Sequence, residues 1–401
     1  MKFINAFLLL ALFVGCSKSS TTSNSPHTTI LSLVADGVTN NAFSLQNSID
    51  SCSNAGGGIL ELPAATGNYM IGPIYMLSNV NLQLDSGATL LADPIMSDYT
   101  IRNKVVDLIR SGNQTLINVS ITGKGTIDGN GQAWWDAFNA DPSISRPRLI
   151  YITGCTNLKL DGITLINSPS FHFVPYQCTN VTVNNVTITA PSNSPNTDGI
   201  DPSQSNGVTI TNCTIDNGDD DIAIKAAGLC QNITVKNCTF KHGHGLSIGS
   251  ETNGGMNGLT VDSCTFNGTT NGIRLKSYTG AGGPMTNLSY SNITMTNVTN
   301  PLVINLSYST PTSAINIPSV NGFTINNLTV TGSSNAGSLV GLSNSILQNI
   351  TLSNINISAN SPLEISNANY VTITNGIING VTVAPGTSNI TKSNVTNTTG
   401  F

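Results

Sequence analysis

Charged and aromatic side chains are scarce in this chain of 401 residues. Asp, Glu, Lys and Arg together make up 9% of the sequence, and Phe, Tyr and Trp make up 5%. The formal net charge of −5 excludes a broad basic surface, so nucleic acid is not expected as a partner. The sequence also lacks Cys-x-x-Cys spacing, and we expect neither a structural metal nor another cofactor.

Apolar runs long enough for targeting are confined to the N-terminus. Lys2 precedes an apolar stretch from Ala6 to Val14, and Leu12-Phe-Val-Gly-Cys16 resembles a bacterial lipoprotein signal with Cys16 as the lipidated residue. Residues 1–16 would then be the signal, and the Ser/Thr-rich residues 17–30 a tether. An ordinary signal peptide cut further along is the alternative. Both interpretations predict export, with membrane attachment only through a lipid.

A short pattern of alternating apolar residues recurs along the chain. One copy is Val181-Thr-Val-Asn-Asn-Val-Thr-Ile188, and copies starting at Leu158, Val181, Val208, Ile233 and Leu259 are 23, 27, 25 and 26 residues apart. A period in the twenties without helical periodicity favours a solenoid of short strands. Disorder is the alternative for a polar chain of low charge, but it lacks regular alternation. The sequence therefore predicts an all-β, single-domain parallel β-helix over residues 31–401.

Three further features have structural interpretations. Asn41 to Cys52 has helical periodicity, with Phe43, Gln46 and Ile49 or their neighbours on one face, which predicts a short helix capping the open end of the solenoid. Trp134 and Trp135 lie in a segment, 129–148, that interrupts the repeat, and they would either stack on sugars or pack on the wall. Equivalent cysteines in successive repeats predict a buried stack; they are Cys213, Cys238 and Cys264.

The chemistry-bearing residues follow the repeat. Three of them each lie two residues before an apolar anchor; the pairs are Asp198 and Ile200, Asp220 and Ile222, and His244 and Leu246. These anchors and Ile273 are 22, 24 and 27 residues apart, close to one turn of the coil. Because parallel strands lie about 4.8 Å apart, the three residues should form a column. Asp219 would lie beside it, with Arg274 and Lys276 one turn further.

Such a cluster suits glycoside hydrolysis. Crowded carboxylates cannot all ionise easily, so one can donate a proton to a leaving oxygen while its partners accept a proton from water. An adjacent Arg and Lys can hold a substrate carboxylate. Each segment alone has another interpretation: Asp198-Gly199 as a turn, 216–221 as a calcium loop, His244 as a tight bend, and the cations as solvated charges. Their coincidence on consecutive repeats favours a site.

The same segments resemble the signature motifs of the polygalacturonases of glycoside hydrolase family 28. The motifs are Ser194-Pro-Asn-Thr-Asp-Gly-Ile-Asp201, Gly218-Asp-Asp220, Gly243-His-Gly-Leu-Ser-Ile-Gly249 and Gly272-Ile-Arg-Leu-Lys276. The resemblance implies a right-handed β-helix that hydrolyses α-1,4-linked galacturonate with inversion. It also implies residue roles: Asp219 as general acid, Asp198 and Asp220 activating water, His244 supporting the acid, and Arg274, Lys276, Tyr308 and Asn196 binding substrate.

Two residues depart from the family pattern. Leu275 stands where the family usually has Ile, an apolar exchange that should be harmless, and Asp221 stands where the family usually has Cys. If Asp221 faced the cleft, its charge would raise the pKa of the acid, although strand parity suggests that it points elsewhere. Other activities on this architecture remain open: hydrolysis of rhamnogalacturonan or xylogalacturonan, calcium-dependent pectate lysis, or glycan binding without catalysis. In each case the expected partner is an acidic polysaccharide, and the expected state is a monomer.

Overall fold

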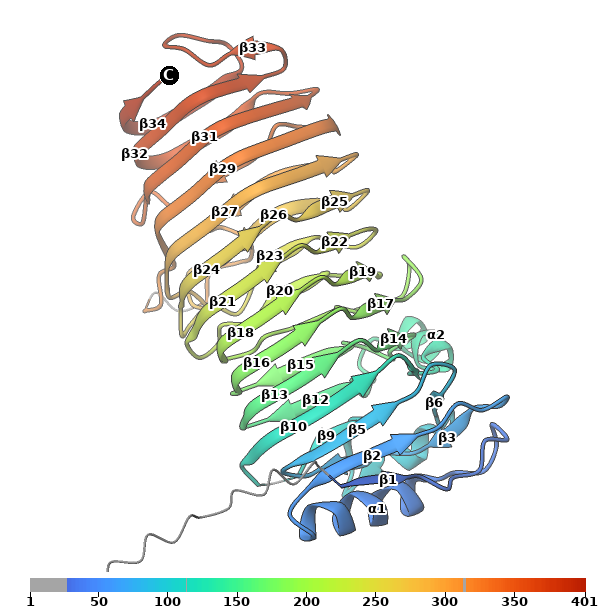
Figure 1. The fold of residues 1–401 in the computed structure, drawn as a ribbon. Coiled ribbons are helices and arrows are strands. Elements are labelled where there is room, and N and C mark those ends of the chain that lie inside the picture. The colour runs from blue at the N-terminus through green and yellow to red at the C-terminus, as the bar shows by residue number, and fades with distance from the viewer. Residues whose placement is uncertain (1–26, 113, 313–314) are drawn as a thin grey trace, which may run out of the picture.

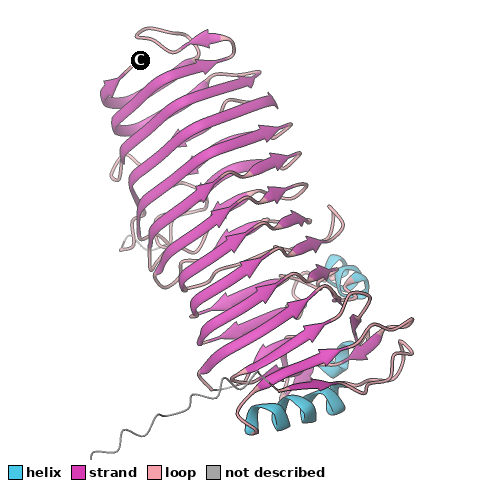
Figure 2. Ribbon diagram, viewed as in Figure 1, coloured by secondary structure: helices cyan, strands magenta, loops and turns pink. Residues whose placement is uncertain are grey.

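The structure, a computed structural model, describes residues 27–112, 114–312 and 315–401. They form one right-handed parallel β-helix, in which each strand pairs with its counterpart one turn later (Figures 1 and 2). The expected all-β solenoid is confirmed. The proposed signal peptide and Cys16 lie outside the described residues. The coil begins within the expected tether, since β1 (Thr28–Ile30) pairs in parallel with β2 (Gly58–Leu62).

The turns of the coil build three parallel sheets. The first continues from β1 and β2 through β5 (Val80–Leu84), β10 (Leu116–Gly123), β13 (Cys155–Asp161), β16 (Thr179–Asn184), β18 (Asn206–Thr211), β21 (Cys230–Lys236), β24 (Met256–Asp262), β27 (Pro284–Thr296), β29 (Ser319–Ser333), β31 (Leu347–Ala359), β32 (Leu363–Ile378) and β34 (Ile390–Thr399). The second contains β3 (Tyr69–Ile71), β6 (Thr89–Ala92), β11 (Thr126–Asp128), β14 (Thr164–Ile166), β17 (Thr187–Thr189), β19 (Thr214–Asp216), β22 (Thr239–Phe240) and β25 (Thr265–Asn267), and it continues into β27.

The third sheet carries the residues of interest. It contains β4 (Ile74–Met76), β9 (Ile109–Ser111), β12 (Ile150–Thr153), β15 (Phe173–Tyr176), β20 (Ile222–Ile224), β23 (Leu246–Ile248), β26 (Asn271–Lys276), β28 (Asn300–Asn305) and β30 (Ser338–Val340). Single bridges at Ile200 connect β15 to β20. Outside the three sheets lie η1 (Met96–Tyr99) and the antiparallel hairpin of β7 (Thr100–Ile101) and β8 (Lys104–Val105). The short β33 (Val381–Thr382) pairs antiparallel with β32.

Inward-facing apolar side chains hold the turns together. Val181 and Val183 of β16 are buried and stand in register with Leu158 and Leu160 of the preceding turn. Burying each such side chain contributes about 1.5–3 kcal/mol, which no isolated turn could gain. Asparagine makes the bends, as Asn157 and its counterparts have positive φ angles and donate to one another along the axis. The expected cysteine stack is confirmed: Cys213, Cys238 and Cys264 are buried and free.

The N-terminal end is covered as the sequence predicts. Helix α1 (Ala42–Asn54) packs on β2, β4 and β5 and buries Leu45 and Ile49. Of the residues expected along one face of this helix, Ile49 is buried, whereas Phe43 is 79% exposed and Leu45, two residues further on, faces the core instead. Within the described residues, no helix combines the length and apolarity needed to cross a bilayer.

The interrupting segment 129–148 contains a second helix, α2 (Gln132–Ala140). Both tryptophans on it are buried: Trp134 meets the edge of the Tyr99 ring, and Trp135 donates through Nε1 to the Ser168 carbonyl at 3.0 Å. Of the two expectations for these rings, packing on the wall is therefore correct, and neither ring is available for stacking on a sugar.

Candidate active site

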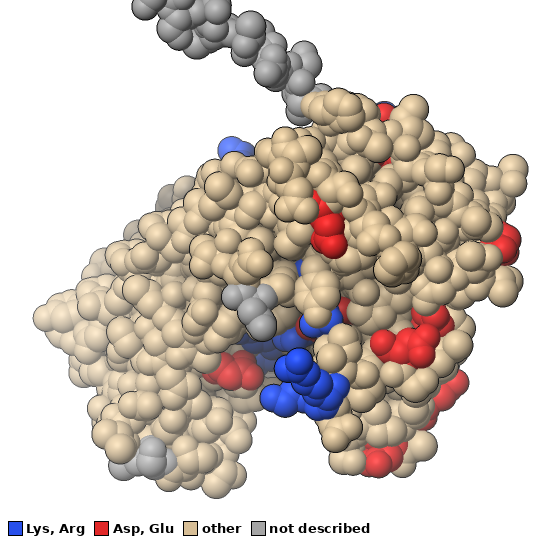
Figure 3. All heavy atoms as spheres, turned by 90° about the horizontal axis from the view of Figure 1, so that it is seen from below, with Lys and Arg blue, Asp and Glu red and all other residues tan. Residues whose placement is uncertain are grey.

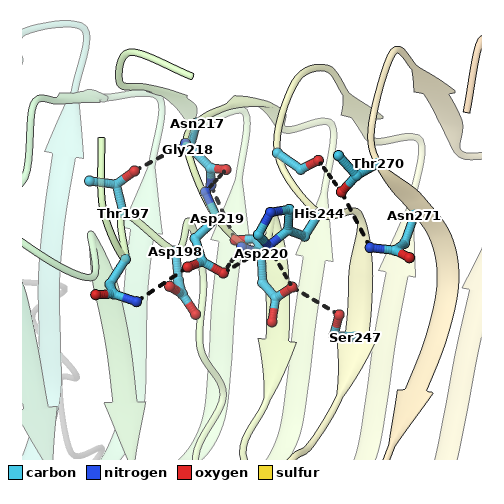
Figure 4. Close-up of polar contacts among 12 residues, drawn as sticks. Thr197, Asp198, Asn217, Gly218, Asp219, Asp220, His244, Ser247, Thr270 and Asn271 are labelled. Carbon is cyan, nitrogen blue, oxygen red and sulfur yellow. Dashed lines mark hydrogen bonds and ion pairs between the residues drawn. The ribbon is translucent and has the colours of Figure 1, made fainter. Parts of the chain in front are cut away.

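The register of the third sheet brings the expected site residues together. Ile200 bridges in parallel to Ile222, which pairs with Leu246, and Leu246 pairs with Ile273. The residues two positions before the first three anchors are therefore neighbours along the axis. Figure 4 shows Asp198, Asp220 and His244 side by side on consecutive turns, with Asp219 among them. The predicted column is confirmed.

Asp219 lies in the turn that leads into β20. Its Oδ1 lies 3.1 Å from His244 Nδ1 and accepts a hydrogen bond from the Asp220 amide at 2.8 Å. Its Oδ2 accepts a bond from Asn196 Nδ2 at 3.3 Å. Burial acts to raise the pKa of Asp219, but the interactions with His244 and the Asp220 amide outweigh it and lower the pKa below its ordinary value. The surroundings of Asp219 thus favour its ionised form, as a hydrogen-bond acceptor.

Asp220 is surrounded by donors. Its side chain is 1% exposed, and its Oδ1 accepts hydrogen bonds from the Ser247 hydroxyl at 3.0 Å and from Arg274 Nη2. Its Oδ2 accepts one from Lys276 Nζ at 3.0 Å. Arg274 Nε also donates to the Ser247 hydroxyl at 2.8 Å. Two cations therefore stabilise the Asp220 carboxylate, as a buried charge requires.

Asp198 occupies a different environment, one turn earlier. Its Oδ2 lies 3.5 Å from Lys225 Nζ, and its buried Oδ1 has no hydrogen-bond partner. Burial and the nearby Asp201 raise the pKa of Asp198 well above its ordinary value, against the opposing charge of Lys225. Burial likewise raises the pKa of Asp201 to about 7. Asp198, and not Asp219, therefore has surroundings that favour a bound proton.

Asp221 points away from this cluster, as strand parity suggested. It is fully buried, and its Oδ2 accepts a hydrogen bond from the Gly245 amide at 2.9 Å. Burial raises the pKa of Asp221 well above its ordinary value. The residue thus supports the bend that carries His244. The calcium-loop interpretation of 216–221 is not supported, because Asp216 pairs with His242 at 2.7 Å while Asp221 faces the core.

The expected substrate-binding residues lie around the column. Arg274 and Lys276 are in place, but both bind Asp220, and their side chains are only 12% and 10% exposed. Tyr308 is about half exposed, and its ring centroid lies 5.6 Å from Lys276 Nζ. Asn196 is exposed between Asp219 and Arg146, whose Nη2 donates to Asn196 Oδ1 at 2.6 Å.

Two cations of the site were not among the predicted residues. Lys225 had a detectable signal, since Ile222-Ala-Ile-Lys225 places its lysine where Ile273-Arg-Leu-Lys276 places Lys276. Arg146 had no such signal in the sequence, because it belongs to the segment after α2, where the apolar repeat is interrupted. Arg146 donates to the carbonyls of Pro169 and Pro195, and it is linked to Asp219 through Asn196.

Asp219, Asp220 and His244 could also hold a metal ion, because one ligand atom from each lies within 4.8 Å of the others. The donor set fits such an ion poorly, however. Lys276 and Arg274 already occupy both oxygens of Asp220, and a third cation there would be repelled.

A β-helix with a row of carboxylates, a histidine and cations along one face has the acid–base groups of an enzyme that cleaves sugar chains. Residues 52–375 match the family model for glycosyl hydrolases family 28, and the chain belongs to this family of glycoside hydrolases.

Relatives with both modes of cleavage are similar to this chain. An endo-polygalacturonase from Pectobacterium carotovorum is 38% identical over 292 residues, which cover 66% of this chain and 71% of the relative. An exopolygalacturonase from Platanus acerifolia is 34% identical over 278 residues, covering 64% and 69%. The solved polygalacturonase from Erwinia carotovora superposes with a TM-score of 0.73 at 30% identity, covering 94% of this chain and 97% of that one.

Proposed function

We propose that this chain hydrolyses α-1,4-galacturonosidic bonds in polygalacturonate or pectin, with inversion. The observation that carries the proposal is the column of Asp198, Asp220 and His244 with Asp219 beside it, on a chain of this family. The names of its relatives, endo- and exo-polygalacturonase, support galacturonate as the sugar.

Asp219 is the proposed general acid. Its side chain is 22% exposed, against 3% for Asp198 and 1% for Asp220 in the column, so a glycosidic oxygen can approach it. An entering galacturonate displaces water and adds negative charge, and both effects raise the pKa of Asp219 from its lowered value. His244, 3.1 Å away, is then a donor from which Asp219 recovers its proton after each cleavage.

Asp198 and Asp220 are the proposed acceptors for the proton of the attacking water. Asp220 accepts hydrogen bonds from two cations, Arg274 and Lys276, which fix its orientation. Ionisation of Asp198 is favoured by Lys225 and, more weakly, by Arg146, whereas the neighbouring carboxylates oppose it. With both groups ionised, the water meets two acceptors on one side of the sugar, as general-base activation requires.

The cations beyond the column are the proposed clamp for a substrate carboxylate. Arg274 and Lys276 have donors beyond those that Asp220 uses, and a guanidinium can bind a carboxylate in a bidentate manner. Tyr308 is exposed beside Lys276 and suits contact with a sugar ring. Asn196 bridges Arg146 to Asp219 and would align the sugar on the acid.

The test is the product formed from polygalacturonate by the purified protein. A hydrolase releases saturated reducing ends and is insensitive to a chelator, and proton NMR of the first product gives its anomeric configuration. An unsaturated, ultraviolet-absorbing product that disappears with a chelator would instead indicate a calcium-dependent lyase. Activity restricted to rhamnogalacturonan or xylogalacturonan would indicate a related backbone hydrolase. Product sizes separate endo from exo cleavage.

We further propose that the protein is exported, acts as a monomer and is held at the bacterial surface through a lipid on Cys16. The apolar N-terminal stretch followed by a Ser/Thr-rich segment supports this location. Fractionation of cells expressing the full chain checks it, and recovery of the protein in the medium alone would contradict the anchor.

A further inference from the structure

We propose that the acidic polysaccharide extends from the catalytic column toward the N-terminal end and meets a second carboxylate-binding site there. This site is formed by Arg110 and Tyr75 on the third sheet and by Arg102 and Lys104 on the β7–β8 hairpin. The inference rests on the proposed function, because it concerns how a long substrate lies in the same cleft.

The register of the third sheet aligns this site with the catalytic column. One ladder of equivalent positions joins them: Tyr75, Arg110, Tyr151, Val174, Asp201, Ala223, Ser247 and Arg274. At about 4.8 Å a step, the six steps from Arg110 to Arg274 span roughly 29 Å. A pyranose unit advances a polysaccharide by a length comparable to one step, so a chain of several sugars would follow this ladder.

Arg110 has unused capacity for an anion. Its Nη2 donates to the Tyr75 hydroxyl at 2.7 Å and its guanidinium carbon lies 4.0 Å from the centroid of the Tyr75 ring, but Nε has no partner. Among the described residues, no carboxylate lies within ion-pair distance of Arg110. By contrast, Arg148 is paired with Asp107. A half-buried arginine held in place by a tyrosine and not neutralised is suited to bind a carboxylate.

The surroundings of Arg110 are hollow and positively charged. A cavity of about 900 Å³ is lined by Arg102, Lys104 and Arg110 and by a single carboxylate, Asp50. Asp50 is itself engaged, since its Oδ1 accepts a hydrogen bond from Gln46 at 2.9 Å. Viewed from the N-terminal end, Lys and Arg side chains gather in one hollow while Asp and Glu are spread around it (Figure 3).

This cavity adjoins the catalytic region. A second hollow of about 600 Å³ has Lys104 in its wall as well, together with Arg146 and Asn196, which reach the column. The carboxylate lining this second hollow, Asp107, is neutralised by its pair with Arg148. Cations thus follow one another from Arg110 to Asp219 in a chain that is otherwise poor in charge, which favours a polyanion over a neutral glycan.

The experiment compares Arg110→Gln with wild type on polygalacturonate and on trigalacturonate, which is too short to reach from the column to Arg110. Loss of a charge-assisted contact should raise KM for the polymer about tenfold, with kcat little changed. KM for the trimer should change less than twofold. Lys124→Gln is the matched control, because it removes an equally positive side chain from the exposed turn between β10 and β11, outside the third sheet; its KM for the polymer should stay at the wild-type value.

Equal effects of Arg110→Gln on polymer and trimer, or no effect on either, would overturn the second site. If Arg110→Gln unfolds by circular dichroism, Lys104→Gln decides in its place, since Lys104 is exposed and lines both hollows. Failure of the proposed function is separately visible, because wild type would then release no reducing ends from either substrate.

Discussion

Replacement of Asp219 by Asn should abolish the release of reducing ends from polygalacturonate while the fold persists. The amide cannot donate an acidic proton to the glycosidic oxygen. Its Oδ1 can still accept the hydrogen bond from the Asp220 amide that Asp219 accepts at 2.8 Å. The substitution therefore removes the proton donor but retains the local backbone contact.

The expected magnitudes follow from these contacts. Loss of a general acid lowers kcat by about 10²–10⁴-fold, which corresponds to roughly 3–5.5 kcal/mol of activation free energy. The cost in stability is the ion pair with His244, whose side chain is 37% exposed, and such a pair contributes at most about 1 kcal/mol. The midpoint of thermal unfolding should therefore fall by no more than about 3 °C.

The assay measures reducing ends from polygalacturonate and, separately, hydrolysis of an aryl galacturonide whose leaving group needs no proton. Asp219→Asn should retain far more of its activity on the aryl substrate, whereas Asp198→Asn should lose activity on both. Asp216→Asn is the matched control, because Asp216 also pairs with a histidine, His242, at 2.7 Å but lies outside the column. Unchanged turnover of polygalacturonate by Asp219→Asn would refute its role as the acid.

Three further substitutions test the surroundings of the column. Lys225→Met removes the cation that lowers the pKa of Asp198, so the acidic limb of the pH profile of kcat/KM should move upward by about one unit; an unmoved limb would exclude Asp198 as the base. Burial raises the pKa of Asp221 above its ordinary value. As the pH rises from the ordinary pKa through the raised one, the buried carboxyl therefore lowers the free energy of unfolding. The thermal unfolding midpoint of Asp221→Asn should therefore exceed that of wild type by more at pH 8 than at pH 4. Equal differences at the two pH values would contradict a cost from ionising the Asp221 carboxyl. Trp135→Phe leaves the buried Ser168 carbonyl without its indole donor and should lower the free energy of unfolding by about 1–3 kcal/mol in a denaturant titration. Its KM for polygalacturonate should not change, and a raised KM would place the ring in the cleft.

Much of the fold could be predicted because a solenoid repeats one local pattern. Val181 and its counterparts mark each turn, and the period converts directly into stacked strands. The capping helix was also predictable, although helical periodicity left its inward face uncertain by two residues, and Leu45 took the place expected for Phe43. The tryptophans were ambiguous because an interrupting segment has no register that fixes its side chains.

The sequence by itself determined which groups share the column. Parallel strands in register place residues at equal distances from their anchors side by side, so Asp198, Asp220 and His244 had to be neighbours. The inward position of Asp221 was not determined in this way, because it follows from the bend before β20, in which its Oδ2 accepts a hydrogen bond from the Gly245 amide.

Only the tertiary structure decided how the charges pair. Long side chains reach across turns, so Arg274 and Lys276 on β26 bind Asp220 from two turns away along the coil, and Lys225 reaches Asp198 one turn earlier. Such contacts depend on the length and burial of each side chain, and the spacing of the apolar repeat in the sequence does not determine either. The same holds for the N-terminal cations, because strand spacing aligns Arg110 with the column, but only the folded hairpin brings Lys104 over the cleft.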